Sequence, residues 1–109
     1  MEKIHWLEEA IEDLNQIYNF ISQNSVYYAM KTTEEILKRA EDLKMQPYIG
    51  RRVIHDNQNI REIIYKSYRI IYKIDSNIIL ILRVWHSARL LSINYISIKK
   101  YLILLYKNF

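Results

Sequence analysis

The second half of the chain contains three runs rich in β-branched and aromatic residues, separated by links of only two and three residues. The runs cover residues 60–65, 68–74 and 78–85. This composition is typical of strands, and links this short leave room only for hairpin turns. The sequence therefore predicts three antiparallel strands in succession.

The first half has a different period, because its apolar residues recur at spacings of three and four. This spacing predicts two amphipathic helices. The first stripe is Leu7, Ala10, Ile11, Leu14, Ile17, Tyr18 and Ile21, and the second is Ala29, Met30, Thr33, Ile36, Leu37, Ala40 and Leu43. The acidic residues Glu8, Glu9, Glu12 and Asp13 are expected on the solvent face of the first helix. A polar break at 23–25 can cap the second helix, and Pro47 ends it.

The helices, joined by so short a link, form an antiparallel hairpin. Residues 4–6 are predicted as a first strand and residues 46–59 as a loop. The expected fold is α+β with the order β-α-α-β-β-β, an antiparallel sheet with the helical hairpin packed on one face. Because the strand runs carry apolar residues at both parities, part of the second face is also expected to be apolar. Residues 1–109 are expected to form one domain, with 92–109 as a C-terminal extension that includes a helix.

Composition excludes several classes of site. With no cysteine, one glycine and one proline, the chain has no thiolate metal site and no glycine-rich phosphate loop. The scattered histidines His5 and His55 belong to no constellation, so we expect no metal and no cofactor. The uncharged apolar stretches, such as residues 78–82, are far too short to span a membrane, and we expect a cytoplasmic protein.

Charge is divided unevenly along the chain. Residues 1–50 have five Lys and Arg against nine acids, a net charge of −4, whereas residues 51–109 have eleven against three, a net charge of +8. Such asymmetry favours a polyanion or an acidic protein as the partner. The candidate target-binding residues are Arg51, Arg52, Arg61, Arg69 and Arg89. The alternative is ordinary solvated charge, with Arg69 paired to Glu62 on the neighbouring strand.

Six strings that follow one another in the chain resemble the ParE/RelE superfamily of bacterial toxins. They are Trp6 with residues 9–14, residues 17–21, 47–51, 61–63, 68–72 and 84–89. The resemblance is greatest to the ParE, or plasmid-stabilisation, branch. It implies a toxin of a type II toxin–antitoxin system that arrests growth by poisoning DNA gyrase and is neutralised by a cognate antitoxin. Two alternatives stay open: a RelE-like, ribosome-dependent endonuclease that cleaves mRNA, and an inactive homologue that only binds antitoxin.

A metal-free RNA-cleaving site needs groups that transfer protons and cations that stabilise the charged phosphorane. His86 would transfer a proton and Arg69 and Arg89 would be the cations, and the alternative for His86 is structural packing. In the RelE comparison, Arg69 matches the arginine of a Tyr-Arg motif and Arg89 a basic position after the last strand. The expected lysine pair is missing and Tyr95 is out of register. The sequence therefore favours a toxin that does not cleave RNA.

Overall fold

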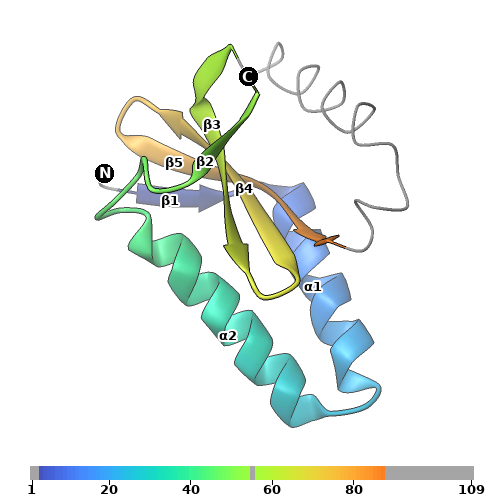
Figure 1. The fold of residues 1–109 in the computed structure, drawn as a ribbon. Helices are drawn as coiled ribbons and strands as arrows, with labels where there is room; N and C mark the ends of the chain where they lie inside the picture. Colours follow the sequence, from blue (N-terminus) through green and yellow to red (C-terminus); the bar gives the residue numbers. More distant parts are fainter. Residues whose placement is uncertain (1–2, 55, 88–109) are drawn as a thin grey trace.

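The computed structural model describes residues 3–54 and 56–87, which form two helices and a five-stranded sheet (Figure 1). In chain order the elements are β1 (Lys3–Trp6), α1 (Glu8–Ser22), α2 (Val26–Asp42), β2 (Arg51–Ile54), β3 (Asn57–Tyr65), β4 (Tyr68–Asp75) and β5 (Ile78–His86). The predicted α+β class and the helical hairpin between the first strand and the later strands are confirmed. The predicted C-terminal helix within 92–109 lies outside the described residues. No helix in the described part of the chain is long and apolar enough to cross a bilayer.

The strands lie in the order β1-β5-β4-β3-β2. The hairpins β3–β4 and β4–β5 are antiparallel as predicted, with turns at Lys66 and Ser76 in the left-handed region, φ 52° and 54°. Two details differ from the prediction. Strand β1 pairs with β5 in parallel, so the sheet is mixed. The segment predicted as a loop over 46–59 contains β2 and the start of β3, because Arg51–Ile54 pairs antiparallel with β3.

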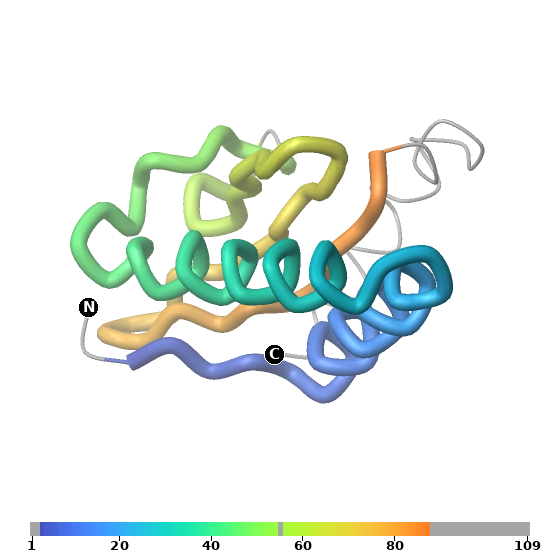
Figure 2. Tube along the Cα trace, turned by 90° about the horizontal axis from the view of Figure 1, so that it is seen from below, coloured from blue at the N-terminus to red at the C-terminus, as the bar shows by residue number. Residues whose placement is uncertain are grey.

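Helices α1 and α2 form an antiparallel pair along one face of the sheet (Figures 1 and 2). Helix α1 begins after Leu7, whose side chain offers no capping hydrogen bond. Helix α2 has the cap that the polar break predicts, since the Ser25 hydroxyl accepts from the Tyr28 N–H at 3.1 Å. The cap fixes where the chain reverses between the helices.

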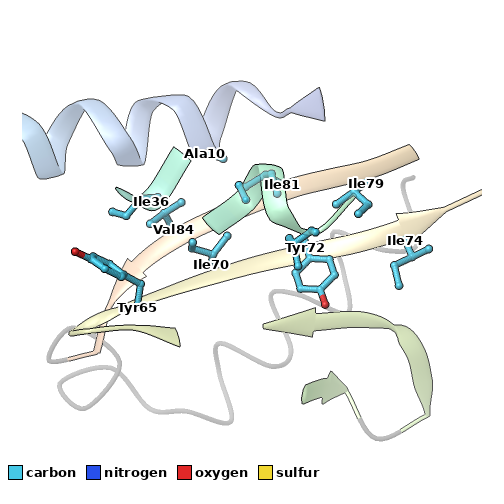
Figure 3. Close-up of a cluster of buried hydrophobic side chains, with 11 residues drawn as sticks. Ala10, Ile36, Tyr65, Ile70, Tyr72, Ile74, Ile79, Ile81 and Val84 are labelled. Atoms are coloured by element: carbon cyan, nitrogen blue, oxygen red, sulfur yellow. The ribbon is translucent and has the colours of Figure 1, made fainter. Parts of the chain in front are cut away.

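The main core lies between the helices and the sheet. Figure 3 shows Ala10 and Ile36 from the helices above a layer of strand side chains, which the sheet presents at alternate positions. The labelled strand residues of this layer are Tyr65, Ile70, Tyr72, Ile74, Ile79, Ile81 and Val84. In β4, Ile70, Tyr72 and Ile74 are buried in this layer, and Tyr68, which has the same parity, is partly buried against it.

A second apolar cluster lies on the other face of the sheet. It consists of Val53, Ile60, Ile71, Leu82 and Trp85, with Leu7, Ile54 and Leu80 packed against it. Strand residues of both parities are therefore buried, as the sequence predicts. We call the surface under α1 and α2 the helix face and the opposite surface the open face, which means only that neither helix covers it.

Strand β5 contains a β-bulge near its middle. Tyr72 pairs with Ile81, but the preceding residue of β4, Ile71, pairs with Arg83, so Leu82 is an extra residue. A shift of one residue moves every later side chain to the opposite face. The side chains of β5 after Leu82 therefore lie on the faces opposite to those that simple alternation from the turn at Ser76 would give them.

Candidate functional site

Three charged residues of neighbouring strands meet on the open face. Arg51 of β2 lies opposite Glu62 of β3, and Glu62 lies opposite Ile71, the second residue after Arg69 in β4. Arg51 Nε donates to Glu62 Oε1 at 2.6 Å, and Arg69 Nη1 donates to the same oxygen at 2.7 Å. The expected Arg69–Glu62 pair is therefore present, with Arg51 as a second cation. We call this trio the arginine–glutamate cluster.

The cluster combines a buried anion with two cations of unequal exposure. The side chain of Glu62 is only 3% exposed, whereas that of Arg69 is 22% and that of Arg51 is 60% exposed. Its formal net charge is +1. Arg69 Nε is buried and has no hydrogen-bond acceptor among the described residues. Each guanidinium has five N–H donors, so one shared carboxylate oxygen leaves much of their donor capacity for another anion.

His86 lies on the helix face, away from this cluster. It pairs across the strands with Tyr68, and the two rings meet edge to face with centroids 5.2 Å apart. Both line a cavity of about 290 Å³ with Ile17 and Phe20 of α1. Arg69 instead pairs with Trp85 and points to the open face. The structure therefore does not bring His86 and Arg69 together.

The bulge at Leu82 is the physical reason for this separation. Uniform alternation from the turn would set Arg69 opposite Val84 and so place His86 on the face of Arg69. The inserted residue sets Arg69 opposite Trp85 instead. The third candidate of the nuclease hypothesis, Arg89, lies outside the described residues.

Other candidate proton-transfer groups are also on the helix face or already bound. Tyr65 belongs to the main core, and Tyr68 packs against it. Burial raises the pKa of Tyr68 above its ordinary value of 10.0, which makes it a weaker acid near neutral pH. Glu62 is held between two arginines. None of these three groups is therefore a free proton-transfer partner beside the arginines of the open face.

Arg61 has a structural role in the loop before β2. Its Nη1 donates to the carbonyl oxygens of Tyr48 and Gly50 at 3.1 and 2.7 Å, and its Nε donates to Gln58 O at 2.8 Å. The guanidinium also stacks over the Tyr48 ring, 5.0 Å from its centroid. Several of its donors are thus committed within the protein, unlike those of Arg51. Arg52, on the adjacent strand, is exposed and pairs across with Arg61.

The same loop is held from inside by Tyr72. The Tyr72 hydroxyl donates to Pro47 O at 2.7 Å and accepts from the Gly50 N–H at 3.0 Å. Burial raises the pKa of Tyr72 above its ordinary value of 10.0, while the Gly50 hydrogen bond and the nearby Arg61 charge act in the opposite direction. Gly50 is needed here, since a Cβ would lie 2.6 Å from the hydroxyl and 2.7 Å from Glu62 O. Tyr72 and Arg61 therefore fix the position from which Arg51 reaches Glu62.

Asp13 is a buried residue that the sequence assigned to the solvent face, and that prediction is wrong. Its carboxylate accepts from Arg83 Nε and Nη2 at 2.7 and 2.9 Å and from the Val84 N–H at 3.0 Å. Pairing of β1 with β5 ends at Trp6 and Ile81, so the Val84 N–H has no partner strand beside it. The Asp13 carboxylate accepts the hydrogen bond that a backbone carbonyl of a longer β1 would otherwise accept. The partners are 70 and 71 residues away in the chain, too far for a periodicity argument.

Acidic and histidine side chains do not gather into a metal site in the described ranges 3–54 and 56–87, where no group of three could hold an ion. The described residues therefore offer arginines, the two buried carboxylates of Asp13 and Glu62, and apolar surface.

Comparisons with known proteins point to one group. Residues 4–91 match the family model described as the ParE toxin of the type II toxin–antitoxin system parDE. A search among curated proteins finds no match. The fold is similar to a solved chain of a chromosomal ParDE system from P. aeruginosa, with TM-score 0.66, 19% identity, and coverage of 79% of this chain and 96% of that one.

Two further solved structures share the fold. A chain of the RelBE2 toxin–antitoxin complex from Mycobacterium tuberculosis aligns with TM-score 0.60 and 20% identity, over 77% of this chain and 95% of that one. A chain of the YoeB–YefM complex from Staphylococcus aureus aligns with TM-score 0.53 and 19% identity, over 76% and 94%. At such identities the likeness concerns the fold.

Proposed function

Because the chain belongs to the ParE toxin family of type II toxin–antitoxin systems, we propose that it arrests growth by poisoning DNA gyrase and does not cleave RNA. A cognate antitoxin neutralises it, as the toxin–antitoxin complexes among its structural relatives suggest. With gyrase as its target, the protein would act in the cytoplasm.

One observation carries the choice against cleavage: His86 and Arg69 project from opposite faces of the sheet. General acid–base catalysis requires the proton-transfer group within hydrogen-bond reach of the reacting atoms, and each such group contributes about 10²–10⁴-fold. A phosphate bound at Arg69 has the sheet between it and the His86 imidazole. Arginine itself is too weak an acid to replace the imidazole, because its pKa exceeds about 12.

The arginines of the open face suit binding better than catalysis. Arg51 and Arg69 are held in place by Glu62, so they meet a partner with little loss of side-chain freedom. We propose gyrase as the partner because the chain belongs to the ParE toxin family. The arrangement supplies the cations that would contact acidic surface on that partner.

The test compares two reactions with the same purified protein. Supercoiling by gyrase is measured on a relaxed plasmid, with trapped cleavage complexes counted after detergent and protease. Ribosome-bound mRNA is examined by primer extension. We expect cleaved plasmid and intact transcripts. Cuts at fixed positions within codons, abolished in His86→Ala, would favour the RNA-cleaving alternative instead.

A matched pair of variants connects the result to the site. Arg69→Gln removes a cation of the arginine–glutamate cluster, whereas Lys31→Gln removes an equal charge from the exposed surface of α2. We expect loss of gyrase poisoning only in Arg69→Gln. Equal activity of the two variants would place the gyrase contact elsewhere.

A further inference from the structure

The apolar cluster of the open face is buried although neither helix covers it. Ile60 of β3, Ile71 of β4 and Leu82 of β5 are 0%, 1% and 1% exposed. They lie on three neighbouring strands, so they form a continuous patch across the middle of the sheet. Ile64, on the same face, is 48% exposed. An apolar strand residue of this face is therefore accessible to solvent unless other atoms lie over it.

The described residues that pack against this cluster do not form a layer over it. Leu7, Ile54 and Leu80 belong to the sheet or to the link that follows β1, so they border the cluster. The two helices lie along the other face (Figures 1 and 2). Side chains in the middle of a sheet are buried by packing against a second layer. The cover of this patch therefore comes from outside the described ranges 3–54 and 56–87.

The chain leaves the sheet beside this cluster. Strand β5 contributes Leu82 and Trp85 to it. After β5, the Ser87 N–H donates to Ser67 O at 2.6 Å, which holds the end of the strand against the β3–β4 turn. Twenty-two residues, 88–109, follow. Its first ten residues alone can span up to about 33 Å when extended, so this segment can reach any part of the face.

The sequence of 88–109 suits a cover for an apolar face. Fourteen of its 22 residues are apolar or aromatic, and none is acidic. Apolar residues recur at spacings of three and four, which predicts a helix with one apolar side, here called the C-terminal stripe: Ile98, Tyr101, Leu102, Leu105 and Phe109. Twelve residues of helix are about 18 Å long, and five strands side by side are about 19 Å across. A helix over 98–109 can therefore lie across the whole sheet.

We propose that residues 88–109 fold back over the open face and cover the cluster that contains Ile60, Ile71 and Leu82. The C-terminal stripe packs on the cluster, and the lysines on the opposite side of the helix face solvent. The match to the ParE family model ends at residue 91, so most of this cover is additional to the family's domain. Arg51, with its side chain 60% exposed, stays outside the cover and accessible to a partner. The proposal does not depend on gyrase as the target.

A segment of the same chain is favoured over a separate partner at this face. Because it is tethered to the end of β5, its effective concentration at the cluster is on the order of millimolar. A second copy of the protein has to reach the same patch from dilute solution. The two occupants therefore differ in whether the cover depends on protein concentration.

The experiment measures how well acrylamide quenches the fluorescence of each of the two tryptophans in the full chain. Trp6→Phe leaves Trp85, which is 7% exposed on the open face. Trp85→Phe leaves Trp6, which packs against the main core on the helix face. These two single-tryptophan proteins report separately on the two sides of the sheet.

A matched pair of double variants is then made in each single-tryptophan protein. Leu102→Gln with Leu105→Gln weakens the C-terminal stripe, whereas Lys100→Gln with Lys107→Gln introduces the same residue on the opposite side of the predicted helix. We expect little quenching of Trp85 in the parent protein and in the lysine variant. Quenching of Trp85 should rise several-fold in the leucine variant, because the face is uncovered. Quenching of Trp6 should not change.

Four results would overturn the proposal. Trp85 of the parent protein is quenched as readily as free tryptophan, or the two double variants quench Trp85 equally. Quenching rises alike at Trp6 and Trp85 in the leucine variant, which indicates loss of the whole fold. The shielding of Trp85 disappears on dilution, which assigns the cover to a second copy. If the leucine variant does not fold by circular dichroism, the quenching of Trp85 in the parent protein and its dependence on concentration still decide.

Discussion

Asp13 connects α1 to β5, and we expect its replacement by alanine to be the most damaging single change among the acidic residues of that helix. The substitution removes three hydrogen bonds at 2.7, 2.9 and 3.0 Å, two from Arg83 and one from the Val84 N–H. Asp13 is only 6% exposed, so water does not readily replace the lost carboxylate.

The magnitude follows from what is left behind. A buried N–H without an acceptor costs about 1–3 kcal/mol. Breaking a fully buried ion pair costs about 3–5 kcal/mol, but the side chain of Arg83 is 20% exposed and can turn toward solvent, which lowers this part. We expect a total loss of about 3 kcal/mol, or a fall in Tm of roughly 15 °C in a domain of this size. Asp13→Asn keeps one acceptor and should lose about half as much.

Urea and thermal unfolding of the purified protein measure the effect. The control is Glu12→Ala, which removes an exposed acid one residue earlier and should change stability by less than about 0.5 kcal/mol. If the two alanine variants unfold alike, Asp13 does not anchor α1 to β5 and the reasoning is refuted.

Three more changes probe the loop before β2, all by urea unfolding. Tyr72→Phe should cost about 1–3 kcal/mol through the lost hydroxyl. Because folding raises the pKa of Tyr72, the neutral hydroxyl stabilises the fold fully below a pH of about 10, and its contribution is lost as the pH rises above that value. Tyr72→Phe should therefore lose less stability at alkaline pH than the wild type. Equal dependence of stability on pH in the two proteins would contradict this argument. Arg61→Gln should lower the free energy of unfolding by about 1–2 kcal/mol, because it removes hydrogen bonds to the carbonyl groups of Tyr48 and Gly50. The control Arg52→Gln should lower it by less than about 0.5 kcal/mol. Equal losses in the two variants would mean that these hydrogen bonds of Arg61 contribute nothing to stability. Gly50→Ala should cost about 1–3 kcal/mol, because its Cβ would lie 2.7 Å from the backbone oxygen of Glu62, and wild-type stability would show that β3 can shift freely there.

Most of the fold could be predicted because local patterns and short links determine it. The helical stripes gave the α1–α2 hairpin, and the two tight turns gave the β3–β4–β5 order. Strand β2 could not be predicted in this way. It is four residues long and follows the loop that contains Pro47 and Gly50, and its pairing with β3 depends on contacts made by Arg61 and Tyr72. The parallel pairing of β1 with β5 joins the two ends of the described chain, and periodicity carries no information on it.

The site was predictable only in part, for a related reason. The Arg69–Glu62 pair follows from the register of a two-residue hairpin, so sequence reasoning finds it. The position of His86 depends on a bulge inside β5, and Leu82 looks like any other strand residue in the sequence. The burial of Asp13 depends on Arg83, a partner that only the tertiary fold identifies.

The bulge also bears on how such chains diverge. Substitutions at Arg69 or His86 change the residues but leave them on opposite sides of the sheet. Deletion of Leu82 would leave His86 opposite Tyr68, so the imidazole would stay on the helix face. Only a β5 that keeps all its residues but has no bulge, with Leu82 opposite Ile71, would bring the imidazole to the side of the arginine. Two related chains can therefore hold the same histidine and arginine and still differ in whether the two side chains share a face, according to whether β5 accommodates one residue as a bulge or as a paired position.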